Sequence, residues 1–180
     1  IKADSLWRIG ITGAGRTVMN IDGGVNGTHP ALSPRWWGNN GRQWYHSWYD
    51  PIAPVSTTPF DCATGGTYHG THTMGIMCGR NSSTGDTVGV APDAYWMAAG
   101  VTDCPGASYP SMNIAAYQWA MDPDSNSTTM DMPDAISCSW QDPTVPGVGQ
   151  CTSIYVSVLN SVEAAGIAVV FSAGNSGSGA

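Results

Sequence analysis

Short apolar runs alternate along the chain with segments in which apolar residues recur at helical spacing. The apolar runs predict buried strands over residues 17–22, 94–101, 135–140 and 167–172, and the last of these is expected to be strongly buried. Helical patterns lie between the strands: one opens at His69, and the others cover residues 112–121 and 152–165. Alternating strands and helices predict an α/β fold whose mainly parallel sheet carries helices on both faces.

Helix ends are marked by capping residues and glycines. Asp4 is expected to cap a short helix that stops at Gly10, and Ser111 is expected to cap the helix over 112–121. Gly166 closes the helix that precedes the last strand. With 180 residues and 42% hydrophobic content, the chain is expected to form one domain.

The segment from 26 to 67 is irregular, rich in proline, and contains a dense group of aromatic residues: Trp36, Trp37, Trp44, Tyr45, Trp48 and Tyr49. One interpretation is a satellite core that folds this loop back onto the sheet. A sharper alternative is an exposed aromatic platform that binds carbohydrate. The group has no regular spacing, which favours the satellite core.

Charge and composition exclude two kinds of partner. The net charge is −7, with 6 basic against 13 acidic residues, which disfavours binding to nucleic acid or to an anionic membrane. No apolar run approaches the roughly 20 residues that span a bilayer. The start of the chain, residues 1–4, lacks the apolar core of a signal peptide, so a secreted protein would already be processed. The 5 cysteines cannot all pair within one chain.

Candidate chemistry begins at residues 68–75, where two histidines stand among small residues at the start of a helix. His69 at the first turn can project from the sheet edge into a cleft. Gly70 and Gly75 weaken the helix, so we interpret both as positions where the backbone packs closely against a neighbour. The alternative is a zinc site that includes His69 and His72, but no third ligand follows at a recognisable spacing.

Two other candidates lie at the ends of predicted strands. Asp22 closes the strand over 17–22 and precedes two glycines, so it is either a site residue or simply a turn former. Asn175 follows the last strand. A carboxylate that orients an imidazole, an imidazole that accepts a proton, and an amide that donates to an oxyanion form a set suited to acyl transfer. His69 supplies the imidazole, and the nucleophile is missing.

Four segments together resemble the ordered motifs of subtilisin-like serine proteases, the subtilases: residues 18–25, 69–75, 89–92 and 171–175. Residues 1–7, 29–32 and 137–140 are most similar to the bacillopeptidase F branch. The resemblance covers nearly the whole chain. It implies a three-layer subtilisin-like fold and serine endopeptidase activity on protein or peptide substrates, in a secreted, extracellular protein.

The resemblance also assigns roles to individual residues. Asp22 and His69 would be the triad acid and base, and Asn175 the side-chain donor of the oxyanion hole. The primary specificity pocket would be lined by Ser139 and Trp140, and the edge that pairs with substrate backbone would be Gly106, Ala107 and Ser108. His72 matches a second, non-catalytic histidine, for which packing is expected. No cofactor is required for the chemistry. Calcium is common in the family, yet no ligand cluster is clear enough to assign.

The sequence departs from the family pattern in two ways. Gly23 stands where a Thr or Ser usually lies beside the acid, and Gln141 where a Gly usually forms the pocket wall. In addition, the nucleophile motif Gly-Thr-Ser-x-Ala-x-Pro is expected after Asn175, and it does not occur in the 180 residues.

We therefore expect residues 1–180 to be the N-terminal part of one catalytic domain, with a fold that is incomplete at the C-terminus. The chain would be inactive alone, with the C-terminal remainder of its own domain as a partner. Because the resemblance places two loops on the same rim of the cleft, a disulfide between Cys62 and Cys104 is a hypothesis, with Cys78 as a buried free thiol. The rival function is a non-catalytic binding module that keeps the fold, and a zinc hydrolase is third.

Overall fold

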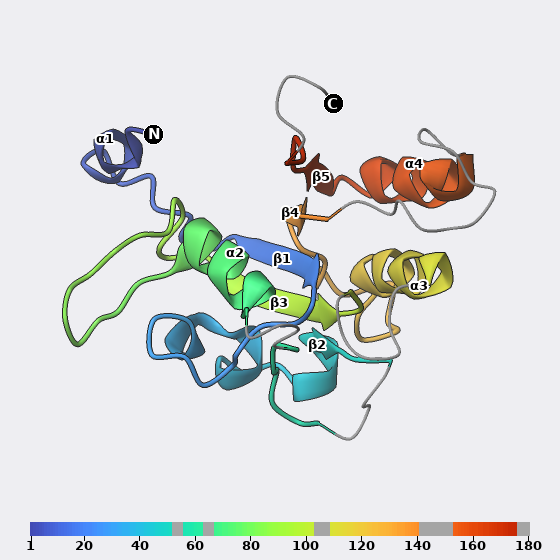
Figure 1. Ribbon diagram of the computed structural model, residues 1–180, viewed down its shortest axis with the longest axis horizontal. Coiled ribbons are helices and arrows are strands. Elements are labelled where there is room, and N and C mark those ends of the chain that lie inside the picture. Colours follow the sequence, from blue (N-terminus) through green and yellow to red (C-terminus); the bar gives the residue numbers. More distant parts are fainter. Residues whose placement is uncertain (52–55, 63–66, 103–108, 141–152, 176–180) are drawn as a thin grey trace.

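The computed structural model describes residues 1–51, 56–62, 67–102, 109–140 and 153–175. Its centre is a sheet with the strand order β2-β3-β1-β4-β5 (Figure 1). The strands are β1 (Thr17–Asp22), β2 (Trp48–Tyr49), β3 (Tyr95–Gly100), β4 (Ala135–Cys138) and β5 (Ala168–Phe171). All pairings among these strands are parallel, so their carboxyl ends share one edge of the sheet. The predicted parallel sheet is confirmed.

Helices cover both faces of this sheet, as predicted. The covering helices are α2 (His69–Cys78), α3 (Pro110–Ala120) and α4 (Val156–Ala164). The short helix α1 (Ala3–Trp7) buries none of its residues, and 3₁₀ turns lie at Ser33–Arg35, Trp37–Asn39, Trp44–His46 and Ser153–Tyr155. Helix α2 packs on one face, while α3 and α4 lie together on the other (Figure 1). None of the helices in the described ranges has the length and apolar character that a bilayer span requires.

Side chains of β1 alternate between two cores because successive residues of a strand point to opposite faces. Met19 and Ile21 are fully buried in the core shared with α3 and α4. Val18 packs against the second core, which α2 covers. Asn20 and Asp22 share this face with Val18, so the two polar residues of the strand are directed toward α2.

Several aromatic residues of the irregular segment form a satellite core. Trp36 and Trp48 are 5% and 2% exposed, and both belong to the buried cluster that contains Trp96 of β3. Tyr49 stacks on Trp119, with ring centroids 5.5 Å apart. These rings therefore stabilise the packing of the loop, as the first interpretation predicts, and the carbohydrate platform is wrong for them.

Two predicted helix caps are wrong. Helix α1 begins at Ala3, with Lys2 at the cap position, and Asp4 instead pairs with Arg8 one turn later, at 2.8 Å. Helix α3 begins at Pro110, so Ser111 lies inside the first turn. Proline at the first position of a helix fits because its fixed φ is already helical and no N–H is lost there.

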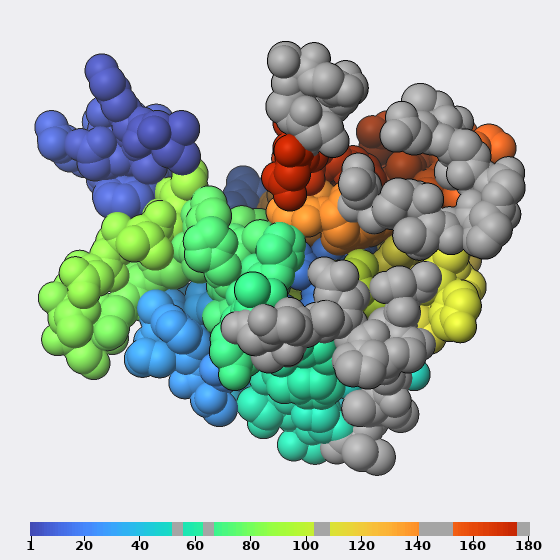
Figure 2. Space-filling view, viewed as in Figure 1, coloured from blue at the N-terminus to red at the C-terminus, as the bar shows by residue number. Residues whose placement is uncertain are grey.

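The burial predicted for the last strand is also wrong. β5 lies at the edge of the sheet, where Val170 is 59% exposed and Phe171 is 47% exposed. Its atoms, red in Figure 2, lie at the surface of the molecule. Apolar composition identifies a strand but does not distinguish an edge position from a central one.

The cysteines divide into two groups. Cys62 is in a disulfide, and its predicted partner Cys104 lies outside the described residues. Cys78 and Cys138 are buried free thiols, which confirms the prediction for Cys78. Burial raises the pKa of each of these two thiols to about 12.

Candidate active site

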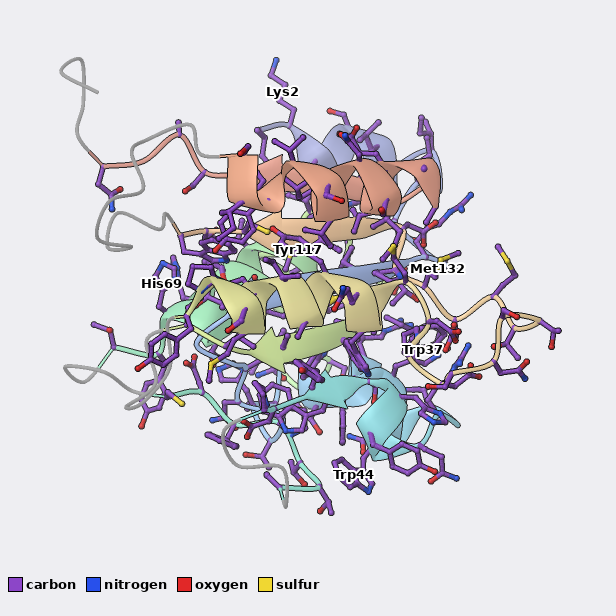
Figure 3. The ribbon with its side chains drawn as sticks, turned by 90° about the vertical axis from the view of Figure 1, so that its right-hand side faces the viewer. Lys2, Trp37, Trp44, His69, Tyr117 and Met132 are labelled. Carbon is purple, nitrogen blue, oxygen red and sulfur yellow. The ribbon has the colours of Figure 1, made fainter. Side chains whose placement is uncertain are left out.

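Asp22 and His69 meet at the carboxyl edge of the sheet. Asp22 is the last residue of β1 and is 1% exposed, and His69 is the first residue of α2. The His69 Nδ1 atom lies 2.8 Å from Asp22 Oδ1 and 3.0 Å from Oδ2. Because the His69 side chain is 45% exposed, the imidazole connects a buried carboxylate to the surface. Figure 3 shows His69 at the end of the sheet toward which the β3 arrow points.

The Asp22 carboxylate is held from several sides. The backbone N–H of Gly23 donates to Oδ1 at 2.7 Å, and the Thr73 hydroxyl lies 3.5 Å from Oδ2. Burial, the largest effect, raises the pKa of Asp22, while the hydrogen bonds from His69 and the Gly23 N–H act in the opposite direction. The glycine at position 23 therefore still supplies a donor to the acid, through its backbone.

The close packing expected at Gly70 is confirmed. A Cβ atom on Gly70 would overlap the carbonyl oxygen of Gly24 and would lie 3.1 Å from the Cβ atom of Asp22. Helix α2 can approach the end of β1 only because this position lacks a side chain. The same interpretation of Gly75 is wrong, since an added Cβ there would have no described atom within 4 Å.

The start of α2 is anchored by Asp61, which sequence analysis missed. The Asp61 Oδ2 atom accepts the Thr71 N–H at 2.7 Å and the Thr71 hydroxyl at 2.6 Å. A carboxylate at a helix N-terminus satisfies an otherwise unpaired N–H and interacts favourably with the helix dipole. Asp61 lies in the irregular segment, ten positions before Thr71, and no pattern in the sequence links the two residues.

His72 does not share a site with His69. His72 is exposed and lines a surface groove with Tyr68 and Ile76, whereas His69 contacts the buried Asp22. The packing expected for His72 is therefore wrong. Across the described ranges, the one group of three or more possible metal ligands contains aspartates alone, so the zinc interpretation gains no support.

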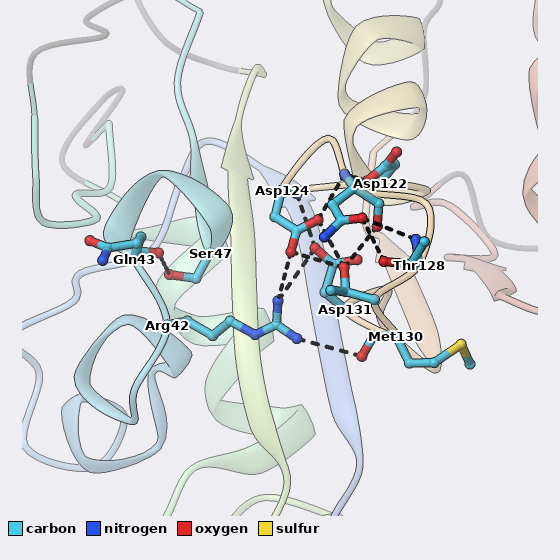
Figure 4. Close-up of polar contacts among 10 residues, drawn as sticks. Arg42, Gln43, Ser47, Asp122, Asp124, Thr128, Met130 and Asp131 are labelled. Atoms are coloured by element: carbon cyan, nitrogen blue, oxygen red, sulfur yellow. Dashed lines mark hydrogen bonds and ion pairs between the residues drawn. The ribbon is translucent and has the colours of Figure 1, made fainter.

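That aspartate group lies after α3, more than 50 positions beyond His69 in sequence, and an arginine lies beside it. Asp122, Asp124 and Asp131 place carboxylate oxygens within 4.8 Å of one another. The Arg42 guanidinium lies 3.4 Å from Asp131 and 3.8 Å from Asp124 (Figure 4). Its central carbon also lies over the Trp37 ring, 4.2 Å from the ring centre. Burial and the nearby Asp124 raise the pKa of Asp131. The oxygen ligands suit calcium chemically, but Arg42 already supplies positive charge there.

The backbone of Asp22 also holds the residues that follow β3. Its carbonyl oxygen accepts the N–H groups of Val101 at 2.9 Å and Thr102 at 3.1 Å. Thr102 is the last described residue before 103–108. The predicted substrate edge, Gly106, Ala107 and Ser108, lies outside the described residues, as does Gln141.

Trp140, which follows β4, is hydrogen-bonded to the end of β1. Its indole N–H donates to the Ile21 carbonyl oxygen at 2.8 Å, and its ring packs edge-on against Phe171 of β5, 5.9 Å away. Ser139, beside it, is half-buried. Asn175 follows β5 and is exposed. Since β1, β4 and β5 are parallel neighbours, these residues share one sheet edge with Asp22, and their predicted roles stay predictions.

The structure is thus a parallel α/β fold that carries an aspartate–histidine pair at the carboxyl edge of its sheet. The sequence model of the subtilase family, Peptidase S8, matches residues 13–180, and the chain belongs to this family. It is 31% identical to bacillopeptidase F of Bacillus subtilis strain 168 over 183 residues, covering 97% of this chain and 12% of that protein.

Two further similar proteins are also subtilisins or subtilisin-like. Subtilisin E of Bacillus subtilis strain 168 is 32% identical over 178 residues, which cover 99% of this chain and 39% of that protein. The crystal structure of a cold adapted subtilisin-like serine proteinase aligns with a TM-score of 0.62 at 20% identity, covering 93% of this chain and 49% of that one. The subtilisin-like fold is thereby confirmed. The chain spans less than half the length of each of these relatives.

Proposed function

We propose that the protein containing this chain is a serine endopeptidase in which Asp22 is the acid, His69 the base and Asn175 the oxyanion donor. The observation that carries the proposal is the contact between His69 Nδ1 and the buried Asp22 carboxylate. Membership of the subtilase family supports the reaction class.

The geometry suits general base catalysis. Asp22 accepts the hydrogen bond of His69 Nδ1–H, which fixes the tautomer in which Nε2 carries the lone pair. Nε2 then takes the proton of a serine hydroxyl as that oxygen attacks the peptide carbonyl carbon. The imidazolium that forms is stabilised by the carboxylate and later gives its proton to the leaving amine.

The oxyanion formed during attack needs donors that are already in place. An amide N–H of Asn175 would supply one of them, at the edge of the sheet that also carries Asp22. The nucleophilic serine is assigned to a part of the protein beyond these 180 residues, because its motif does not occur in them. The isolated chain should therefore be inactive.

The substrate class and location follow from the same assignment. Substrates are proteins or peptides, with Ser139 and Trp140 near the primary pocket and residues 106–108 pairing with substrate backbone. The disulfide at Cys62 supports an oxidising, extracellular location. The minor extracellular protease Vpr of Bacillus subtilis strain 168 is 35% identical over 116 residues, which cover 64% of this chain and 13% of that protein.

The test uses the full-length protein, a fluorophosphonate probe and peptide substrates. Wild-type protein should be labelled at a serine outside this chain and should cleave peptides. The His69→Ala variant should lose about 10⁴- to 10⁶-fold in kcat. The matched control is His72→Ala, an exposed histidine three residues later that should keep activity within about threefold. Absent labelling of the folded wild type, or an active His69→Ala variant, would show that the protein is not a serine peptidase of this kind.

A further inference from the structure

Two polar side chains beside the Asp22–His69 pair have no part in the steps above. Asn20 lies in β1 two residues before Asp22, on the same face of the sheet, and is fully buried. Thr73 lies in α2, one turn after His69. The Asn20 Nδ2 atom is 3.0 Å from the Gly70 carbonyl oxygen and 2.9 Å from Thr73 Oγ1. The Asn20 amide therefore joins β1 to the first turn of α2.

These contacts direct the Thr73 proton. Thr73 Oγ1 lies 3.0 Å from the Gly70 carbonyl oxygen and 3.5 Å from Asp22 Oδ2, but a hydroxyl has only one proton to donate. One N–H of Asn20 already goes to the Gly70 oxygen, and the other goes to Thr73 Oγ1. The Gly70 oxygen has a second lone pair that can also accept from Thr73 and lies nearer, but the ionised carboxylate of Asp22 is the stronger acceptor, and we assign the Thr73 proton to it.

We propose that Thr73 and Asn20 are positioning residues for the acid of the triad. Asn20 orients the Thr73 hydroxyl, and this hydroxyl holds Asp22 Oδ2 so that the carboxylate faces His69 Nδ1. The proposal rests on the proposed function. With the Gly23 N–H on Oδ1, the carboxylate is held at both oxygens. Helix α2 thus provides the side-chain hydroxyl that position 23 lacks.

The burial of Asn20 points to function rather than stability. Its Oδ1 atom is buried without a hydrogen-bond partner in the part of the chain that the structure describes. An unsatisfied buried oxygen destabilises a fold, and an apolar residue of the same shape would remove that cost. Asparagine at this core position therefore brings a penalty that an orienting role explains.

The experiment compares variants of the full-length protein. Thr73→Val removes the hydroxyl with little change of shape, and it should lower kcat about tenfold with KM within about twofold. It should also move the acid limb of the kcat/KM profile to higher pH, because a carboxylate with one donor fewer stabilises the imidazolium more. Thr73→Ser keeps the hydroxyl and should restore both values.

Asn20→Leu should lower kcat by a similar factor while the melting temperature stays equal or rises. The double variant should be no slower than Thr73→Val alone, because both residues act through one hydrogen-bond chain. Thr17→Val is the matched control: Thr17 is buried in β1 at its other end, and its loss should leave kcat unchanged.

Wild-type kcat and pH profile in Thr73→Val, or an equal loss in Thr17→Val, would overturn the proposal while the peptidase function stands. A full-length protein without peptidase activity would overturn the proposed function instead. In that case the low-field NMR signal of the His69 Nδ1 proton still tests the positioning. The signal should be sharp in wild type and shifted or broadened in Thr73→Val, and an unchanged signal would overturn the inference.

Discussion

Helix α2 rests on the chain that follows Asp22, with Gly70 directly against the carbonyl oxygen of Gly24. We predict that Gly70→Ala pushes the start of α2 away from β1 and lengthens the contact between Asp22 and His69. The expected result is a loss of about 10²-fold or more in kcat/KM, because misplacement by about 1 Å is sufficient for such an effect. Steady-state kinetics of the full-length variant, with a melting curve, measures this loss.

The control for this substitution lies in the same helix. Gly75→Ala adds a methyl group where no described atom lies within 4 Å, and it replaces the poorer helix former. We expect it to raise stability by up to about 1 kcal/mol and to leave kcat/KM unchanged. Equal behaviour of the two variants would contradict the close approach at Gly70.

Asp22 should reduce stability at neutral pH. Burial raises the pKa of Asp22 above its ordinary value of 3.8, so the folded chain holds this proton more tightly than the unfolded chain does. The charged carboxylate therefore lowers stability above the raised pKa, and this loss disappears as the pH falls toward 3.8. We expect Asp22→Asn to melt at a higher temperature than wild type at pH 7, while kcat falls about 10⁴-fold.

Melting curves from pH 7 down to pH 4 provide the check on this sign. The difference in melting temperature between Asp22→Asn and wild type should shrink as the pH falls through the raised pKa of Asp22 toward 3.8. A difference that grows toward low pH would mean that the ionised Asp22 stabilises the fold.

The sequence was sufficient to single out Asp22 and His69, which the structure brings into contact. Asp22 ends an apolar strand before two glycines, and His69 opens a helix among small residues, so each stands out locally. Asn20 and Thr73 do not, since a polar residue in a strand or on a helix has many ordinary explanations. Their relation to Asp22 appears only when β1 and α2 are placed side by side.

The errors have physical causes as well. The apolar residues of β5 indicate a strand, but exposure depends on which strands lie beside it, and this is a property of the whole sheet. The prediction that Asp4 caps the first helix was wrong because a carboxylate is also favourable inside the first turn. There it interacts with the helix dipole and pairs with Arg8.

Asn175→Ala should lower kcat by about 10²- to 10³-fold with little change in KM, because the amide would serve charge that develops in the transition state. The measurement is steady-state kinetics of the full-length protein on a peptide substrate. A loss confined to KM would show that Asn175 binds the ground-state substrate.

The two buried thiols should be unreactive in the folded protein. Cys78 and Cys138 are buried and their pKa is raised to about 12, so little thiolate exists at pH 8. We expect iodoacetamide to modify both only after unfolding, and Cys62 only after unfolding and reduction. Peptide mapping by mass spectrometry checks this, and alkylation of Cys138 in folded protein would contradict its burial.

Asp22 contacts two segments at once, through its side chain with His69 and through its carbonyl oxygen with Val101 and Thr102. If residues 106–108 bind substrate as proposed, one backbone position carries both the chemical step and the docking of the peptide. A shift of the β1 terminus would then change kcat and KM together. Selection for a new substrate preference would therefore find few useful changes around residue 22, and adaptation would be concentrated in loops whose movement leaves the end of β1 fixed.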